Sequence, residues 1–192
     1  PVGLTLLAGR PKVGKSWLAL DIATGLANYG TVCGVRAARK VRTLYLALED
    51  NPRRLQHRLT VTGYPRGTDL LLATKWSLLD KGGLELLQKN VREQDIGLVI
   101  VDTLAKLRPV ESRVKSLYAA DYEVLGAVKE LADRLGITVI VVHHLRKAGA
   151  ADPLEEVSGT TGLTGAADTV LILKRSRGIA DGTLFITGRD VE

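Results

Sequence analysis

Residues 9–16 read Gly-Arg-Pro-Lys-Val-Gly-Lys-Ser, which is a complete G-x-x-x-x-G-K-S motif. The apolar run Leu4–Ala8 precedes the motif, and the segment Lys15–Ala27, which has the pattern of a helix, follows it. In this setting the glycines let backbone N–H groups point into the turn, and the helix N-terminus adds a partial positive charge. The stretch therefore predicts a loop that binds the phosphates of a nucleotide.

Individual residues of this loop have different expected roles. Lys15 is suited to neutralise phosphate oxygens, and the hydroxyl of Ser16 is suited to bind Mg²⁺. The predicted nucleotide-binding residues are Gly9, Arg10, Pro11, Lys12, Val13, Gly14, Lys15, Ser16 and Trp17.

Short apolar runs alternate with longer amphipathic stretches along the rest of the chain. Most of the runs contain few polar residues, as expected for parallel strands that are covered on both faces. This order predicts one α/β domain over 1–192, with a doubly wound, largely parallel sheet and right-handed crossovers. The last two runs follow each other without a helix, which predicts a C-terminal antiparallel hairpin. The predicted strands are Leu4–Ala8, Arg42–Leu48, Leu70–Ala73, Leu98–Val101, Ile137–His143, Thr169–Leu173 and Thr183–Thr187, and the predicted helices are Lys15–Ala27, Pro52–Thr62, Gly83–Glu93 and Leu117–Leu135.

The composition limits the class of protein. With 192 residues, 45% of them hydrophobic, the chain has the makeup of a soluble globular domain. The single cysteine, Cys33, excludes a disulfide framework and fits a reducing compartment, so we expect a cytoplasmic protein. The net charge of +6 favours a polyanionic partner only weakly, because many basic surfaces are merely solvated. The chain contains no Met, so we expect it to be a trimmed part of a longer protein.

Two further apolar strands lead directly into carboxylates. Asp102 follows Leu98–Val101 and is placed to hold Mg²⁺ through water, although a strand can also end in Asp as a turn former. Glu49 ends another apolar run and is placed to orient and deprotonate an attacking water molecule. The alternative is that this segment caps the next helix, and both roles fit if Asp50 or Asn51 is the cap.

A pair of histidines ends the apolar run Val139–Val142. We predict that His143 contacts the γ-phosphate, and the alternative is a hydrogen-bonded structural histidine. Because neighbouring residues on a strand point to opposite faces, His143 and His144 are poor candidates for a shared metal site.

Together these elements resemble the RecA-type ATPase core over nearly the whole chain. More closely, the chain is similar to the RepA-like branch, which is related to the hexameric replicative helicases of the DnaB group and to KaiC and RadA ATPases. The resemblance implies a RecA-like P-loop fold, Mg²⁺-dependent ATP hydrolysis and a homohexameric ring with ATP between subunits. The residues that carry it are Gly9–Ser16, Leu46–Asp50, Val99–Thr103, Val142–Lys147 and Ser158–Thr169.

The resemblance also implies that a neighbouring subunit supplies a basic residue to the γ-phosphate. Arg189 matches the end of the last hairpin strand of the family, and the other candidates are Lys174, Arg175 and Arg177. Helicases of the DnaB group carry a Lys two residues before that Arg, where this chain has Thr187.

Finally, the resemblance places single-stranded DNA in the central hole of the ring, near the connections Ala105–Ser116 and Arg146–Gly165. The candidates for phosphate contacts are Arg108, Arg113, Lys115, Arg146 and Lys147. Neither connection contains an aromatic residue, so we expect binding to be mainly electrostatic. The alternative functions are a nucleotide-gated DNA-binding assembly without unwinding activity and, less well supported, a P-loop small-molecule kinase.

Overall fold

A seven-stranded sheet with the order β5-β4-β6-β7-β1-β8-β9 forms the centre of the chain. The computed structural model describes residues 2–28, 30–37, 39–64, 69–108, 117–144, 161–176 and 178–189, without the side chains of 117–121 and 161–162. Neighbouring strands from β5 to β8 are parallel, and β9 runs antiparallel to β8, as the sequence predicts. The strands are β1 (Gly3–Gly9), β4 (Thr43–Ala47), β5 (Leu70–Ala73), β6 (Leu98–Asp102), β7 (Thr138–His144), β8 (Thr169–Lys174) and β9 (Thr183–Gly188).

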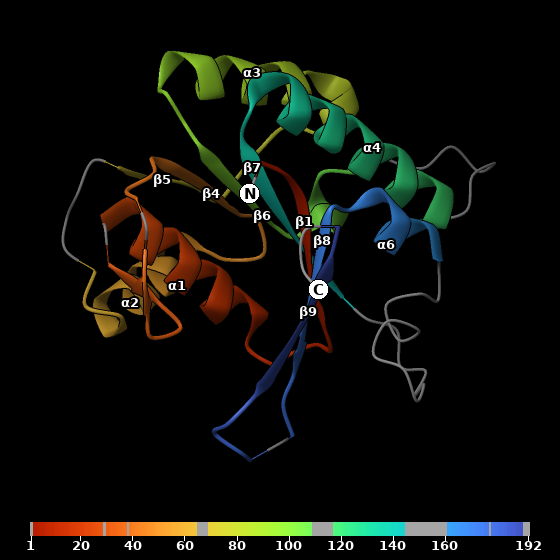
Figure 1. Cartoon of the computed structure of the whole chain (residues 1–192). Coiled ribbons are helices and arrows are strands. Elements are labelled where there is room, and N and C mark those ends of the chain that lie inside the picture. The colour runs from red at the N-terminus through yellow and green to blue at the C-terminus, as the bar shows by residue number, and fades with distance from the viewer. Residues whose placement is uncertain are drawn as a thin grey trace.

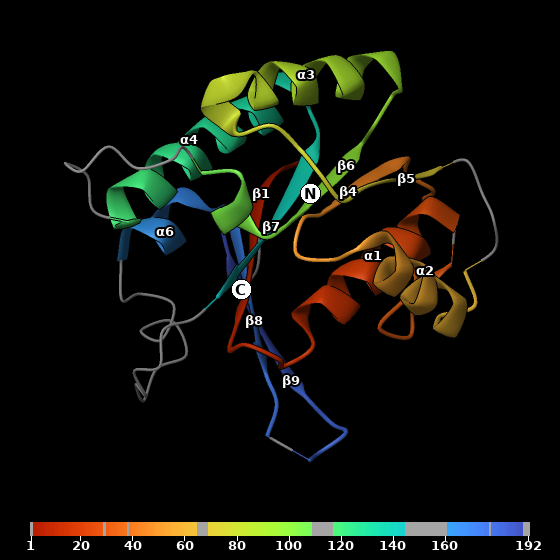
Figure 2. The same cartoon turned by 180° about the vertical axis from the view of Figure 1, so that it is seen from behind.

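Helices cover both faces of this sheet, as Figures 1 and 2 show. One face carries α1 (Lys15–Asn28) and α2 (Pro52–Val61), and the other carries α3 (Gly83–Glu93), α4 (Leu117–Leu135) and α6 (Thr161–Ala166). Short elements complete the fold: the ribbon β2 (Thr31–Val32) and β3 (Val35–Arg36), and the 3₁₀ turns η1 (Leu79–Lys81) and η2 (Leu104–Lys106). Among the helices of the described ranges, none is both long enough and apolar enough to span a membrane.

The strands alternate between two hydrophobic cores, one on each face of the sheet. On β7, Val139 and Val141 pack on the side of α3 and α4, whereas Ile140 and Val142 pack on the side of α1. Successive residues of a strand point to opposite faces, so the same alternation decides which way the polar residues at the strand ends point.

The predicted helix boundaries rest on cap residues that the structure confirms. Asn51 caps α2, because its Oδ1 accepts a hydrogen bond from Arg54 N at 2.9 Å, and Pro52 occupies the first turn. Gly136 ends α4 with φ of +65°, and Ile137 N donates to Ala132 O at 3.1 Å.

One predicted connection contains a helix that the sequence pattern did not indicate. Helix α6, Thr161–Ala166, covers the last five residues of the expected loop Arg146–Gly165 and the residue after it. This stretch is rich in Thr and Gly, which have low helix propensity, but Leu163 is only 2% exposed and joins the core beside α4. Tertiary packing therefore overrides local preference there. The boundaries of β7 also shift by one residue, so that the strand includes His144.

Candidate nucleotide-binding and catalytic site

The glycine-rich loop connects the carboxyl end of β1 to the start of α1, as the sequence predicts. Gly9 is aligned with His144 on β7 and with Leu173 on β8. A Cβ atom on Gly9 would lie 2.7 Å from the carbonyl oxygen of Leu173, so this close approach between the loop and β8 requires glycine. Further along the loop, Gly14 adopts φ of +114°, which also favours glycine.

The side chain of Lys15 folds back over this loop. Its ammonium donates to the carbonyl oxygens of Gly9 at 2.7 Å and Arg10 at 2.9 Å, and it lies 3.2 Å from Nδ1 of His144. Burial lowers the pKa of Lys15 to about 8, although the negative charges of Asp102 and Glu49 oppose this shift. These carbonyl partners are weak substitutes for anions, so phosphate oxygens would compete well for the ammonium.

Asp102 ends β6 beside Ala47 of β4 and is only 2% exposed. The hydroxyl of Tyr45 donates to Oδ2 of Asp102 at 2.9 Å, whereas Oδ1 is buried and has no hydrogen-bond partner among the described residues. Burial raises the pKa of Asp102, while interactions with the hydroxyls of Ser16 and Tyr45 lower it.

This arrangement fits a magnesium site. An unpartnered buried carboxylate oxygen is costly unless a cation or its bound water compensates it. The hydroxyl of Ser16 interacts with the same carboxylate, and oxygen ligands are those that Mg²⁺ prefers. Ser16 and Asp102 therefore offer the donor set that the sequence assigned to the metal.

Glu49 lies in the turn between β4 and α2, with its side chain 43% exposed. The hydroxyl of Thr103, a residue only 1% exposed, donates to Oε1 of Glu49 at 3.1 Å. Leu48 N donates to Asp102 O at 2.7 Å, which ties this turn to the end of β6. Asn51, and not Glu49, supplies the helix cap, so the carboxylate of Glu49 is not used for capping. Thr103 holds one of its oxygens and the side chain is accessible to water, as a general base requires.

His144 contacts two other residues of the predicted site, Lys15 and Glu49. Its Nε2 lies 3.7 Å from Oε2 of Glu49, while its Nδ1 faces Lys15. The alternation of β7 explains this placement, because His144 continues the series of Ile140 and Val142 on the side of α1. The pair His143–His144 was visible in the sequence, but choosing between them requires the strand register.

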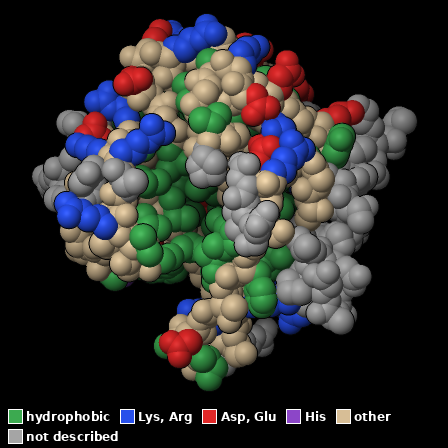
Figure 3. Space-filling view, in the orientation of Figure 1, with side chains coloured by type: hydrophobic (Ala, Val, Ile, Leu, Met, Phe, Trp, Pro, Cys, Tyr) green, Lys and Arg blue, Asp and Glu red, His purple; other side chains and the backbone are tan. Residues whose placement is uncertain are grey.

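A cavity of about 390 Å³ lies between the glycine-rich loop and the β8–β9 hairpin. Arg10 and Val13 line it from the loop, and Leu173 and Ile179 are its apolar residues from the hairpin. In Figure 3 the hairpin projects below the body of the molecule, and hydrophobic side chains gather on the surface above it. The hairpin and the glycine-rich loop therefore line the same cavity.

The basic residues predicted to act on a neighbouring subunit occupy two different places. Lys174 and Arg175 line the cavity beside the loop of their own chain, and Arg177 lies outside the described residues. Arg189 follows β9 at the end of the sheet where β8 starts, because Gly188 pairs with Thr169. This is the end opposite to the one that carries the glycine-rich loop. Arg189 is therefore a full strand length away from its own glycine-rich loop.

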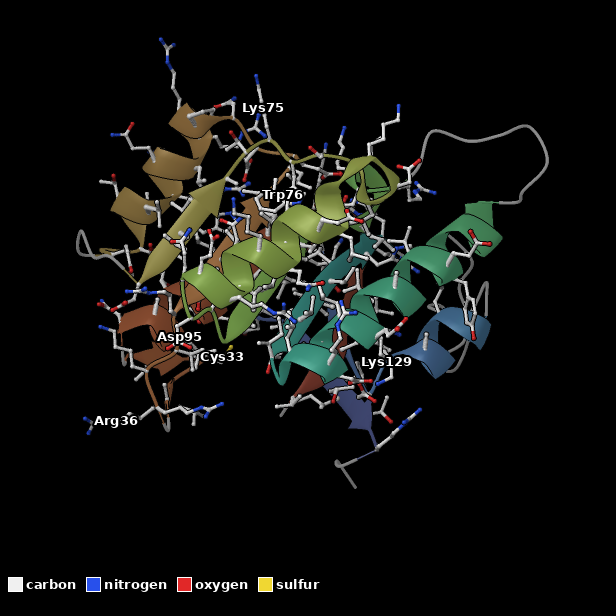
Figure 4. The ribbon with its side chains drawn as sticks, turned by 90° about the horizontal axis from the view of Figure 1, so that it is seen from above. Cys33, Arg36, Lys75, Trp76, Asp95 and Lys129 are labelled. Atoms are coloured by element: carbon white, nitrogen blue, oxygen red, sulfur yellow. The ribbon has the colours of Figure 1, made fainter. Side chains whose placement is uncertain are left out.

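Asp168 anchors Arg189 at that far edge. Its carboxylate accepts from Leu4 N at 2.9 Å and from the Lys129 ammonium at 2.6 Å, and it lies 3.6 Å from Nη1 of Arg189. Figure 4 shows Lys129 projecting from α4. Burial alone would raise the pKa of Asp168, but the partners Lys129, Leu4 and Arg189 outweigh it and hold that pKa below its ordinary value.

Of the predicted DNA contacts, only Arg108 lies in the described part of the chain, where it follows η2. Arg113, Lys115, Arg146 and Lys147 lie outside the described residues. Their assignment stays a prediction.

The curated relatives of this chain include several bacterial RadA proteins. "DNA repair protein RadA" of Halalkalibacterium halodurans is 25% identical over 178 residues, which are 92% of this chain and 34% of that protein. The protein of the same name from Synechocystis is 27% identical over 188 residues, again 92% of this chain and 34% of the relative. The chain thus spans about a third of the length of these relatives.

Comparison with solved structures identifies the fold, and a family model identifies the family. One solved ATPase domain superposes with a TM-score of 0.69 at 17% identity, covering 98% of this chain and 78% of that one. A KaiC-like protein from Pyrococcus horikoshii gives a TM-score of 0.60 at 17% identity, covering 98% and 79% of the two chains. The fold is therefore that of a RecA-like ATPase domain, as predicted. The family model AAA_25, described as an AAA domain, matches residues 2–150, and the chain belongs to that family.

Proposed function

We propose that this chain hydrolyses ATP with Mg²⁺ and couples hydrolysis to single-stranded DNA in a ring formed with copies of itself. The observation that carries the proposal is the convergence of Lys15, Asp102 and Glu49 at one edge of the sheet, with His144 in contact with both Lys15 and Glu49. A loop for phosphates, an unpartnered carboxylate for a cation and a water-accessible base together provide what phosphoanhydride hydrolysis requires.

The residues of this chain would act as follows. Lys15 would exchange the carbonyl oxygens of Gly9 and Arg10 for phosphate oxygens. Ser16 and Asp102 would hold Mg²⁺, which supplies neutralisation of phosphate charge. Glu49, oriented by Thr103, would accept a proton from the attacking water molecule.

A histidine at the end of β7 would respond to the γ-phosphate. The sequence points to His143, whereas the contacts of His144 with Lys15 and Glu49 favour the second histidine. Separate substitution of each histidine distinguishes the two assignments.

DNA coupling draws support from the relatives and from charge. The name DNA repair protein RadA is carried by the relatives reported above, and the chain has a net charge of +6. We assign the DNA contacts to Arg108, Arg113, Lys115, Arg146 and Lys147 and the ring to a homohexamer. In this arrangement Arg189 would reach the γ-phosphate of the next subunit, and a RepA-like replicative helicase is the function that this assembly suits.

A second candidate shares the chemistry but not the unwinding. The alternative is an assembly that binds DNA under nucleotide control without separating strands, built on the fold that the chain shares with a KaiC-like protein. Strand displacement on a forked duplex distinguishes the two, because only the helicase separates the strands. Native mass spectrometry of the same sample tests the ring.

The ATPase assignment is tested with Glu49→Gln and Lys15→Ala. Both variants should abolish ATP turnover, but Glu49→Gln should still bind ATP because the phosphate loop is intact. Near-normal turnover by Glu49→Gln would show that Glu49 is not the base. Phosphate release without an added acceptor would exclude a small-molecule kinase.

Coupling to DNA is tested by measuring ATP turnover with and without single-stranded DNA across a salt series. We expect stimulation that weakens steeply with salt, because binding through phosphate contacts displaces counterions. Turnover that is identical with and without DNA at low salt would contradict the coupling.

A further inference from the structure

We propose that Arg58 is a positioning residue that holds the turn carrying Glu49 in a fixed position relative to the phosphate-binding helix α1. This inference rests on the proposed role of Glu49 as the base. It comes from a chain of three side chains, Trp17, Arg58 and Asp50; Trp17 is one of the predicted nucleotide-binding residues, whereas Arg58 and Asp50 have no role in the phosphate, metal or base contacts described above.

The first link joins α2 to the residue beside Glu49. The guanidinium of Arg58 makes an ion pair with Oδ2 of Asp50, whose side chain is only 6% exposed. Arg54 also pairs with Asp50, through Oδ1 at 3.2 Å, but its side chain is 54% exposed, compared with 16% for Arg58. A solvated ion pair contributes little, whereas removing one partner of a shielded pair leaves the other charge uncompensated, so loss of Arg58 should disturb Asp50 more than loss of Arg54.

The second link joins Arg58 to the phosphate-binding helix. The guanidinium carbon of Arg58 lies 5.4 Å from the ring centroid of Trp17, within the range of a cation–π contact. Trp17 directly follows Ser16, and its backbone N–H donates to Gly14 O at 3.0 Å. Arg54, although it shares Asp50, has no such contact with Trp17 among the described residues.

These links add a second set of restraints on the turn of Glu49, from elements other than β6. Thr103 and the backbone of Asp102 hold the turn from β6, whereas Arg58 holds it from α1 through Trp17. A general base must stay within hydrogen-bond reach of the attacking water molecule, so a small displacement of the turn lowers the rate without weakening nucleotide binding.

The test compares Arg58→Gln with Arg54→Gln in ATP turnover at saturating single-stranded DNA. Both variants remove one guanidinium from Asp50, but only Arg58→Gln also breaks the contact with Trp17. We expect Arg58→Gln to lower kcat about tenfold with KM for ATP within about twofold, and Arg54→Gln to stay within about twofold in both. A kcat of Arg58→Gln within about twofold of the parent overturns the proposal.

Two further measurements separate positioning from general destabilisation. Combined with Glu49→Gln, Arg58→Gln should cause no additional loss of single-turnover rate, because its effect passes through Glu49; a further tenfold loss overturns the proposal. If Arg58→Gln does not fold, Asp50→Asn replaces it, with the same expected loss of kcat and the same overturning result. Should Glu49→Gln alone keep normal turnover, the base assignment fails, whereas an inactive Glu49→Gln beside a fully active Arg58→Gln refutes only the role of Arg58.

Discussion

Nδ1 of His144 lies 3.2 Å from the ammonium of Lys15, at the point where the phosphate-binding loop meets the end of β7. Because the ammonium can only donate, Nδ1 is the acceptor, and Nε2 carries the proton that faces Glu49. One imidazole thus connects the predicted phosphate ligand to the predicted base. If bound phosphates take over Lys15, we expect the contact between Lys15 and His144 to change as well.

This geometry predicts unequal effects for the two histidines. His144→Asn should lower ATP turnover about tenfold, since it removes the group between Lys15 and Glu49, whereas His143→Asn should change it less than about threefold. The measurement is steady-state phosphate release at saturating ATP and DNA. The reverse ranking would restore His143 as the residue that contacts the γ-phosphate.

ATP affinity should depend on pH through Lys15. Its pKa of about 8 in the nucleotide-free protein means that the ammonium is charged below this value and loses its proton above it. Bound phosphates favour the charged form and raise that pKa, so binding takes up a proton between about pH 8 and the bound-state value. We expect an affinity that is constant below about pH 7 and falls by up to about tenfold per pH unit above about pH 8.

Calorimetry in two buffers of different ionisation enthalpy at alkaline pH measures this proton uptake directly. Lys89→Ala is the matched control, because Lys89 is 66% exposed on α3 and should leave the profile unchanged. An affinity that stays constant from pH 7 to pH 9.5 would contradict the assignment.

Two glycine-to-alanine changes should have opposite effects on stability. Gly9→Ala places a methyl group 2.7 Å from Leu173 O, so the loop must move away from β8; we expect loss of nucleotide binding and destabilisation of about 2 kcal/mol. Gly126→Ala in the exposed interior of α4 meets no atom within 4 Å and should stabilise the protein by about 0.5–1 kcal/mol. Chemical denaturation and ATP titration of both variants check these signs. A Gly9→Ala protein with normal ATP affinity would show that the loop tolerates the displacement.

The sequence predicts the chemistry of this site better than its geometry. Asp102 and Glu49 could be found because carboxylates at the ends of parallel strands converge at one sheet edge. The sequence predicts His143 as the residue that contacts the γ-phosphate, but the face to which each histidine points depends on the register of β7, which the sequence alone does not define.

Long-range pairings account for the rest of what the sequence did not reveal. The ion pair between Asp168 and Lys129 joins residues 39 positions apart, and the contact of Asp168 with Leu4 N spans 164 positions. No local pattern encodes such contacts. The helix α6 was missed for a related reason, because the burial of Leu163 depends on α4 and not on the Thr- and Gly-rich stretch around it.

Asp168→Asn should destabilise the fold in a manner that depends on pH. The substitution removes the negative charge that joins the start of β1, α4 and the end of β9, and we expect a loss of about 2 kcal/mol at pH 7. Since the pKa of Asp168 is lower in the folded protein than in the unfolded chain, its contribution is fully present above the unfolded value of 3.8 and is lost as pH falls through the folded value. Urea unfolding from pH 7 to pH 2.5 should therefore show the two proteins converging in acid. A constant difference across this range would exclude the charge as its source.

Arg189 should act on the active site of another copy of the chain. It lies at the sheet edge opposite to its own Lys15, and Asp168 holds it there, so its side chain serves its own nucleotide poorly. We expect Arg189→Ala and Lys15→Ala to lack ATP turnover when measured separately. When they are mixed, an intact loop from Arg189→Ala can meet an intact Arg189 from Lys15→Ala, and turnover should return to about a quarter of the parent value, the fraction of interfaces that random mixing completes. The control is a mixture of Lys15→Ala with Glu49→Gln. Both variants are defective on the side of the subunit that binds the nucleotide, so no interface is complete and the mixture should stay inactive. A mixture of Arg189→Ala and Lys15→Ala that remains inactive, although native mass spectrometry shows mixed rings, would mean that Arg189 does not act between subunits.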